Sequence, residues 1–353
     1  MIDSIRLQRF RSYRDASFEF DGGVNIIIGP NASGKTNLLE AILVLCLGKS
    51  YRARDIEMIR FGDSWARLDG FFGKDARVVR IVHKTGKLAK SYELGGKTYQ
   101  RLALERTIPV VLFEPNSLQL LIRGPKQRRE YFDDILERSL PGFKKLAASY
   151  RRALAQRNAL LKQSHNIAKK QLFAWNIRLS ELGAQIASAR KDLVDDINGS
   201  VPKSYSKIAK KRSRVELVYD SPIDIANYSS RLLSKLEKAV EADFRYGFTA
   251  YGPHRDDFVF YLNGREAAAA ASRGETRSLI IALKIFELSL LERVRGQKPV
   301  FLLDDVFSEL DGARRHHLVD YLKTHQSIIT TTDAEAVMEY FSKDHRLIPL
   351  AKS

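Results

Sequence analysis

The sequence predicts an α/β fold in which a mixed sheet flanked by helices carries a phosphate-binding loop, with a helical lobe inserted into the domain. Gly29–Thr36 reads GPNASGKT, a glycine followed by four residues and then Gly-Lys-Thr. The apolar run Val24–Ile28 precedes this loop, and Asn37–Leu47 follows with apolar residues spaced as on one helix face. A second apolar run, Pro299–Leu303, ends in two aspartates. Strand, loop, helix and acidic strand end together predict a nucleotide-binding domain.

The segments around the loop are predicted to be mostly antiparallel strands. Ile2–Arg9 alternates apolar and polar residues, as a half-buried strand does, and Phe18–Phe20 is predicted to be its hairpin partner. A meander with a turn at Gly95-Gly96 follows, and then a continuous apolar run of buried-strand type. The predicted strands of the meander and the buried run are Ala66–Phe72, Arg77–His83, Ser91–Leu94 and Pro109–Phe113.

Residues 121–244 are predicted to form a helical, basic lobe, with residues 1–120 and 245–353 forming the nucleotide-binding domain. Apolar spacing predicts a long helix within Pro141–Ser180, a second over Leu172–Ile197 and a third over Tyr228–Phe244. Neither Pro141–Ser180 nor Pro202–Arg214 contains an Asp or Glu. Such one-sided charge predicts contact with DNA or RNA, the alternative being a solvated helix face. The candidate contacts are Lys144, Lys145, Arg151, Arg152, Arg157, Lys210, Lys211 and Arg212.

Composition points to a polyanionic partner in a reducing compartment. The chain has 353 residues and a net charge of +17, and no apolar run approaches the length of a membrane helix. Nucleic acid is therefore favoured over a membrane as the partner. The single cysteine, Cys46, excludes an internal disulfide and fits the cytoplasm.

The loop chemistry predicts that a nucleoside triphosphate and Mg²⁺ bind together. Backbone N–H groups of such a loop point at a polyphosphate, and the following helix adds its N-terminal partial charge. Lys35 is predicted to reach the β and γ phosphates, and Thr36 and Asp304 to hold Mg²⁺. Asp305 is predicted to orient or deprotonate the attacking water, so that Lys35, Asp304 and Asp305 are the catalytic candidates. The nucleotide-binding candidates are Gly29, Pro30, Asn31, Ala32, Ser33, Gly34, Lys35, Thr36 and Asn37.

The C-terminal part returns to ordered elements. Tyr251–Asp257 reads as a turn into the strand Phe258–Leu262, in which His254 is interpreted as a structural hydrogen-bonding group. Asn263-Gly264 is a hairpin signal. Ser272–Arg277 opens a further predicted helix, another runs through Leu322, and Ser327–Thr332 is the last predicted strand.

Three motifs resemble the ABC/SMC class of ATPases. They read GPNASGKTNLLEAI, SRGETRS and VFLLDDVFSELD, in this order and with a long separation. The resemblance implies an ABC-type P-loop head that forms a homodimer with ATP, in which a signature motif reaches the γ-phosphate of the partner subunit. The implied signature residues are Ser272, Arg273, Gly274 and Glu275, and the implied dimer seam is Ser308, Glu309, Leu310 and Asp311.

Further stretches are similar to the bacterial RecF family from the first strand to the last. They read RFRSY, GKSYRARD, FEPNSLQLLIRGPKQRREYFDDIL, YGPHRDDF, LLDDVFSELDGARR and TTTD. This resemblance implies a cytoplasmic repair protein that binds gapped or single-strand/double-strand junction DNA and works with RecO and RecR to load RecA. The chain departs from the wider class at Asp305, where a glutamate is usual, which implies slow hydrolysis. It also lacks the usual sensor glutamine in Val110–Glu114.

Three other functions are alternatives. An SMC-type DNA-tethering ATPase needs long heptad arms between the motifs, and the intervening residues are few and irregular. A transporter ATPase leaves the net charge of +17 unexplained. A nuclease needs a second metal-binding cluster, which the sequence does not display although residues distant in sequence could form one.

Overall fold

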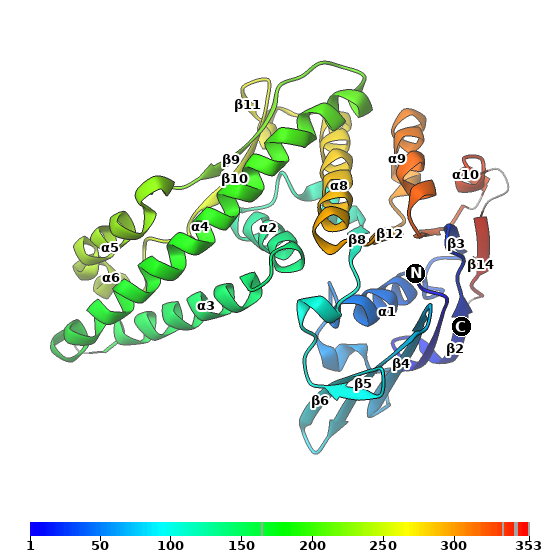
Figure 1. Cartoon of the computed structure of the whole chain (residues 1–353), viewed down its shortest axis with the longest axis horizontal. Coiled ribbons are helices and arrows are strands. Elements are labelled where there is room, and N and C mark those ends of the chain that lie inside the picture. The colour runs from blue at the N-terminus through cyan, green and yellow to red at the C-terminus, as the bar shows by residue number, and fades with distance from the viewer. Residues whose placement is uncertain (164, 334, 342–344, 352–353) are drawn as a thin grey trace. The chain divides into compact units, whose positions relative to one another are not determined.

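The computed structural model describes residues 1–163, 165–333, 335–341 and 345–351, and the chain divides into two compact units (Figure 1). The first unit, here called the head, comprises Met1–Leu118 and Lys284–Ser353. The second, here called the lobe, comprises Gln119–Leu283. The first boundary of the lobe falls between Leu118 and Gln119, and the lobe was predicted to begin at residue 121.

Two β-sheets, one antiparallel and one parallel, build the head. The first is antiparallel, with strand order β2-β1-β4-β5-β6-β7, and includes the predicted hairpin of β1 and β2. Its strands are β1 Ser4–Phe10, β2 Tyr13–Glu19, β4 Trp65–Phe72, β5 Asp75–Lys84, β6 Lys87–Leu94 and β7 Lys97–Tyr99. The second is parallel, with order β14-β3-β13-β12-β8. Its strands are β3 Val24–Ile28, β8 Val110–Phe113, β12 Val300–Asp304, β13 Ser327–Thr331 and β14 His345–Pro349.

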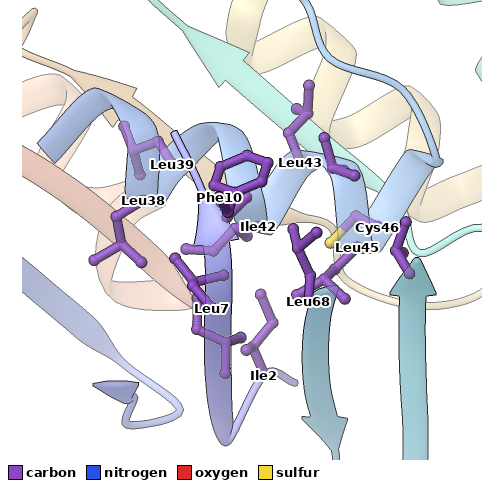
Figure 2. Close-up of a cluster of buried hydrophobic side chains, with 14 of the residues drawn as sticks. Ile2, Leu7, Phe10, Leu38, Leu39, Ile42, Leu43, Leu45, Cys46 and Leu68 are labelled. Atoms are coloured by element: carbon purple, nitrogen blue, oxygen red, sulfur yellow. The ribbon is translucent and has the colours of Figure 1, made fainter. Parts of the chain in front are cut away.

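Helix α1, Lys35–Leu47, contacts strands of both sheets and forms the centre of the head core. Its apolar side chains meet those of β1 and β4, with Ile42, Phe10 and Leu68 in the cluster that Figure 2 shows. Because the helix is covered on more than one side, it is apolar almost all round rather than on a single stripe. Burial raises the pKa of the Cys46 thiol to about 12, so this thiol stays protonated at neutral pH.

The parallel sheet brings the two predicted site motifs to one edge. Strand β13 lies between β3, which leads into the phosphate loop, and β12, which ends at Asp304. In the register of the sheet, Thr330 lies opposite Ile27 on one side and Asp304 on the other. The carboxyl ends of parallel strands share an edge, so the loop and the acidic strand end meet there. The described part of the head also contains α9 Gly312–Thr324 and α10 Glu335–Met338.

The lobe combines helices with a small antiparallel sheet. Helices α3 and α4 lie side by side, and α5 packs on α4 (Figure 1). The lobe helices are α2 Pro125–Ser139, α3 Phe143–Leu160, α4 His165–Ala209, α5 Tyr228–Lys238, α6 Val240–Tyr246 and α7 Ala267–Ala270, and α8 Arg273–Arg295 contains the boundary to the head. The sheet has the order β11-β10-β9, with β9 Val215–Asp220, β10 Asp257–Leu262 and β11 Arg265–Glu266. Among the described residues, no helix combines the length and apolar character needed to cross a membrane.

Two predictions about the lobe are corrected. The second domain boundary lies between Leu283 and Lys284 rather than at residue 245, because β10 pairs with β9 and so belongs to the lobe. The helix predicted over Tyr228–Phe244 is two helices that meet at Ala239.

Candidate nucleotide-binding site

The phosphate loop has a shape that only glycine permits at two positions. A Cβ atom on Gly29 would lie 2.5 Å from Ser33 Oγ and 2.7 Å from the Leu350 carbonyl oxygen. Gly34 has a φ of 100°, and a Cβ there would lie 2.7 Å from the hydroxyl oxygen of Tyr13. Both glycines of the motif are therefore required by the backbone path and by close neighbours.

Lys35 lies within the curl of this loop. The residue is 5% exposed, and its Nζ donates hydrogen bonds to the carbonyl oxygens of Gly29 at 2.8 Å and Pro30 at 3.1 Å. These neutral acceptors hold the ammonium group where phosphate oxygens could replace them. Among the described residues, the buried Ser33 Oγ has no hydrogen-bond partner. A buried cation on weak acceptors and an unpaired hydroxyl are the features expected of a polyphosphate site.

Asp304 joins the loop to the neighbouring strands. Its Oδ1 accepts hydrogen bonds from Thr36 Oγ1 at 3.0 Å and Thr330 Oγ1 at 2.8 Å. The hydroxyl of Tyr51 lies 3.4 Å from Asp304 Oδ2. Adjacent ligands of an octahedron about 2.1 Å from Mg²⁺ lie about 3.0 Å apart. The Thr36 and Asp304 oxygens therefore fit two neighbouring positions around Mg²⁺.

Asp305 differs from its neighbour in backbone and environment. Its φ is 53°, in the left-handed region, and its backbone N–H donates to Thr330 Oγ1 at 3.0 Å. Burial raises the pKa of the Asp305 carboxyl, Asp304 and Glu309 raise it further, and Lys35 opposes them. A carboxylate with a raised pKa is a better proton acceptor, which suits the predicted role towards water. Thr330 and Tyr51 are site residues that the sequence did not predict.

Behind the loop helix, a buried carboxylate ties the RFRSY and GKSYRARD motifs together. Glu40 is 0% exposed and accepts bonds from Arg11 at 2.8 Å, Arg52 at 3.0 Å and Ser50 at 2.5 Å. Burial alone would raise the pKa of Glu40, but these hydrogen bonds outweigh it and lower the pKa. Arg52 also donates to Asn37 Oδ1 at 2.6 Å. The network fixes the residues beside the loop, and it was not predicted.

The predicted signature residues start α8 with a capping box. The backbone N–H and the Oγ of Ser272 donate to Glu275 Oε2 at 3.0 and 2.9 Å, and the Glu275 N–H donates back to Ser272 Oγ at 3.3 Å. These bonds lower the pKa of Glu275. Arg273 is exposed and Gly274 half-buried, and Lys211 of the predicted DNA-binding set lies 3.9 Å from Glu275.

The predicted dimer seam is partly corrected. Asp311 is the N-cap of α9 and accepts a bond from the Arg314 N–H at 3.0 Å, and Glu309 is half-buried. Leu310 is 2% exposed, so its side chain packs inside the head and cannot line a seam. The side chain of Ser308 lies outside the described residues.

One predicted DNA contact is wrong. Arg157 is 0% exposed, and its guanidinium donates to Asn176 at 2.7 Å, Asp243 at 2.7 Å and Thr249 at 2.8 Å. It holds α3, α4 and the end of α6 together instead of facing solvent. The other predicted DNA contacts are exposed, namely Lys144, Lys145, Arg151, Arg152, Lys210, Lys211 and Arg212.

Replacing this buried arginine should therefore affect folding rather than DNA contact. Arg157→Ala leaves Asp243 buried without its charged partner, which is expected to lower the free energy of unfolding by about 3–5 kcal/mol. Lys145→Ala, an exposed change on the same helix, is the control and should be nearly neutral. Urea unfolding of both variants measures the difference, and equal stabilities would contradict the structural role.

The YGPHRDD segment is held by hydrogen bonds, and His254 makes structural hydrogen bonds, as predicted from the sequence. Nε2 of His254 donates to the Thr249 carbonyl at 3.0 Å, so Nδ1 accepts from the Tyr150 hydroxyl at 2.8 Å. Burial lowers the pKa of His254 to about 4, so the ring is neutral at pH 7. Two arginines of α2 reach the same segment, since Arg128 pairs with Asp257 and Arg129 donates to the Asp256 carbonyl at 2.6 Å.

The head thus has the fold and the loop geometry of a P-loop ATPase of the ABC/SMC-like class. Residues 1–348 match the model of the RecF/RecN/SMC N terminal domain family, and the chain belongs to this family, in its RecF branch. The protein named DNA replication and repair protein RecF from Heliobacterium modesticaldum is 34% identical over 346 residues, covering 95% of this chain and 93% of that one. The protein of the same name from Clostridioides difficile is 32% identical over 340 residues, covering 94% of this chain and 91% of that one. The predicted resemblance is confirmed.

Solved structures agree with this assignment. The solved structure of the recombination mediator protein RecF-ATP in the RecFOR pathway has a TM-score of 0.83 and 29% identity, covering 94% of this chain and 92% of that one. An Smc head domain from Pyrococcus yayanosii has a TM-score of 0.53 at 14% identity, which extends the likeness of fold to SMC heads.

Proposed function

We propose that this chain is an ATP-dependent DNA-binding protein of recombinational repair and replication-fork maintenance. The observation that carries the proposal is the meeting of the phosphate loop with Asp304 through Thr36, in a chain related over its length to RecF proteins. The relative solved as RecF-ATP is a recombination mediator protein of the RecFOR pathway. We propose that this chain also binds ATP and acts in the RecFOR pathway, in the cytoplasm.

The proposed chemistry assigns one task to each group. Loop N–H groups and Lys35 bind the β and γ phosphates, while Thr36 and Asp304 hold Mg²⁺, which when bound offsets phosphate charge. Asp305 accepts a proton from the attacking water. Ser272–Glu275 of a second copy closes the site, so ATP drives homodimer formation and slow hydrolysis releases it.

The proposed partner is gapped or single-strand/double-strand junction DNA, with RecO and RecR as protein partners in loading RecA. Support for DNA comes from the net charge of +17 and from exposed cations such as Lys144 and Arg151 on α3.

The alternative of an SMC-type tether is less favoured. Helix α4, 45 residues long, contacts α3, α5 and β9 inside the lobe, and a tether needs a free arm. The nuclease alternative has no support within the described ranges, which hold no cluster of three or more His, Cys, Asp or Glu suited to a metal.

Equilibrium binding to a gapped duplex at fixed salt tests this function. Salt must be fixed because phosphate contacts make affinity depend on ionic strength. Tight binding with ATP, and much weaker binding with ADP or without nucleotide, is the expected result. Equal binding in all three states would contradict a nucleotide-controlled clamp.

Asp305→Asn is expected to slow ATP hydrolysis by roughly 100-fold or more with little change in ATP affinity, because the amide cannot accept the proton. Asp320→Asn, an exposed change on α9, is the control. Since a base acts when deprotonated, the wild-type rate should rise with pH through the raised pKa of Asp305, and the variant should lose this rise. The measurement is phosphate release by wild type and variant across pH. An unchanged hydrolysis rate in Asp305→Asn would show that Asp305 is not the proton acceptor.

A further inference from the structure

Two large aromatic side chains are exposed at the end of α6. Tyr246 is 64% exposed and Phe248 is 42% exposed, on either side of Gly247. Their ring centroids lie 5.8 Å apart with 28° between the planes, a stacked pair. We call Tyr246 and Phe248 the aromatic platform. Exposed aromatic pairs of this size are uncommon on a surface without a partner.

Hydrogen bonds hold the backbone on both sides of the platform. Gly247 ends α6 with a φ of 73°, and its N–H donates to the Asp243 carbonyl at 2.8 Å. Asp243 Oδ1 accepts from the Ala250 N–H at 3.1 Å, and the Thr249 N–H donates to Asn158 at 2.9 Å. The segment is thus fixed on both sides of the two rings. A fixed pair of rings loses little conformational entropy when a flat ligand stacks on it.

Cations surround the platform. The exposed Arg255 places its guanidinium 4.8 Å from the centroid of Phe248. The side chain of Lys162 comes within 4.0 Å of the position of a Cβ on Gly247, and Arg245 is exposed beside Tyr246. Lys162 lies two residues after the end of α3, whose whole sequence is free of Asp and Glu. Aromatic faces beside cations that follow a phosphate backbone are the combination with which proteins bind single-stranded nucleic acid.

We propose that the aromatic platform binds unpaired bases of single-stranded DNA by stacking, while Arg245, Arg255 and Lys162 contact the adjoining phosphates. Paired bases are stacked inside a duplex, so the platform distinguishes a gap from intact DNA. The inference rests on the proposed DNA-binding function and adds the surface that recognises the single strand. The three exposed cations beside the rings, Lys162, Arg245 and Arg255, favour nucleic acid over a protein partner.

The double variant Tyr246→Ala/Phe248→Ala tests the platform by equilibrium binding to an oligothymidylate at fixed salt, with ATP present. Affinity is expected to fall about 10-fold or more, as for loss of base–aromatic stacking, whereas affinity for a blunt duplex stays nearly unchanged. Tyr246→Phe/Phe248→Tyr keeps both rings and should bind like wild type. Because both side chains are exposed, thermal unfolding of all variants should coincide.

An abasic oligonucleotide of equal length separates stacking from charge. It carries the same phosphates without bases, so wild type and the alanine variant should bind it equally weakly. Equal losses on single strand and duplex, or a loss that persists on the abasic strand, would overturn the stacking role. Unchanged binding of the alanine variant to oligothymidylate would overturn the platform alone. Failure of wild type to bind any DNA would overturn both the platform and the proposed function.

Discussion

Lys35→Ala is expected to weaken ATP binding by roughly 100-fold or more. The ammonium group is nearly buried on the carbonyl oxygens of Gly29 and Pro30, and those bonds can be exchanged for bonds to phosphate oxygens. Removing one partner of a buried charged pair costs about 3–5 kcal/mol, and each 1.4 kcal/mol is a tenfold change in affinity. Calorimetric titration with ATP and Mg²⁺ measures the loss.

The control for this experiment is a lysine of the head that faces solvent. Lys97→Ala on β7 removes the same charge at an exposed position and should leave ATP affinity unchanged. The net charge then falls equally in both variants, so a difference between them reports the position of Lys35. Similar ATP affinity in the two variants would remove the phosphate-loop assignment.

The loop could be predicted because its determinants are local in sequence. Val24–Ile28 is both the predicted and the observed strand, and the helix predicted from Asn37 to Leu47 is α1. The partners of Asp304 could not be predicted, because Tyr51 is 253 residues away along the chain and Thr330 is 26 away. Strand pairing brings Thr330 beside Asp304, whereas Tyr51 reaches it from the loop after α1.

Composition could not distinguish exposed from buried charge. Arg157 lies in an acid-free stretch, but its partner Asp243 is 86 residues further along, so the stretch looked uniformly basic. Helix α2 was not predicted because most of its residues are charged or polar and its buried positions are few. Strand β9 follows a basic stretch that was interpreted by charge, and its pairing with β10 moved the boundary of the lobe.

Ser272→Arg is expected to abolish ATP-dependent dimer formation while the monomer still binds ATP. In the proposed dimer, Ser272 approaches the γ-phosphate of the partner subunit, and an arginine side chain there obstructs closure. The predicted ATP-binding loop of the same chain belongs to the head, whereas Ser272 belongs to the lobe. Loss of the Ser272 cap costs the helix about 1 kcal/mol, too little to unfold the chain. Sedimentation velocity with ATP and with ADP measures dimer formation.

Ser200→Arg, which adds the same charge at an exposed serine of α4, should dimerise like wild type. A mixture gives the sharper test of action between subunits. Lys35→Ala lacks the phosphate contact but keeps its signature, and Ser272→Arg keeps its loop but lacks the signature. A mixed dimer therefore has one complete site, and the mixture should form ATP-dependent dimers that neither variant forms alone. If the mixture stays monomeric, two complete sites are needed for closure. If Ser272→Arg dimerises by itself, the signature does not act on a partner's nucleotide.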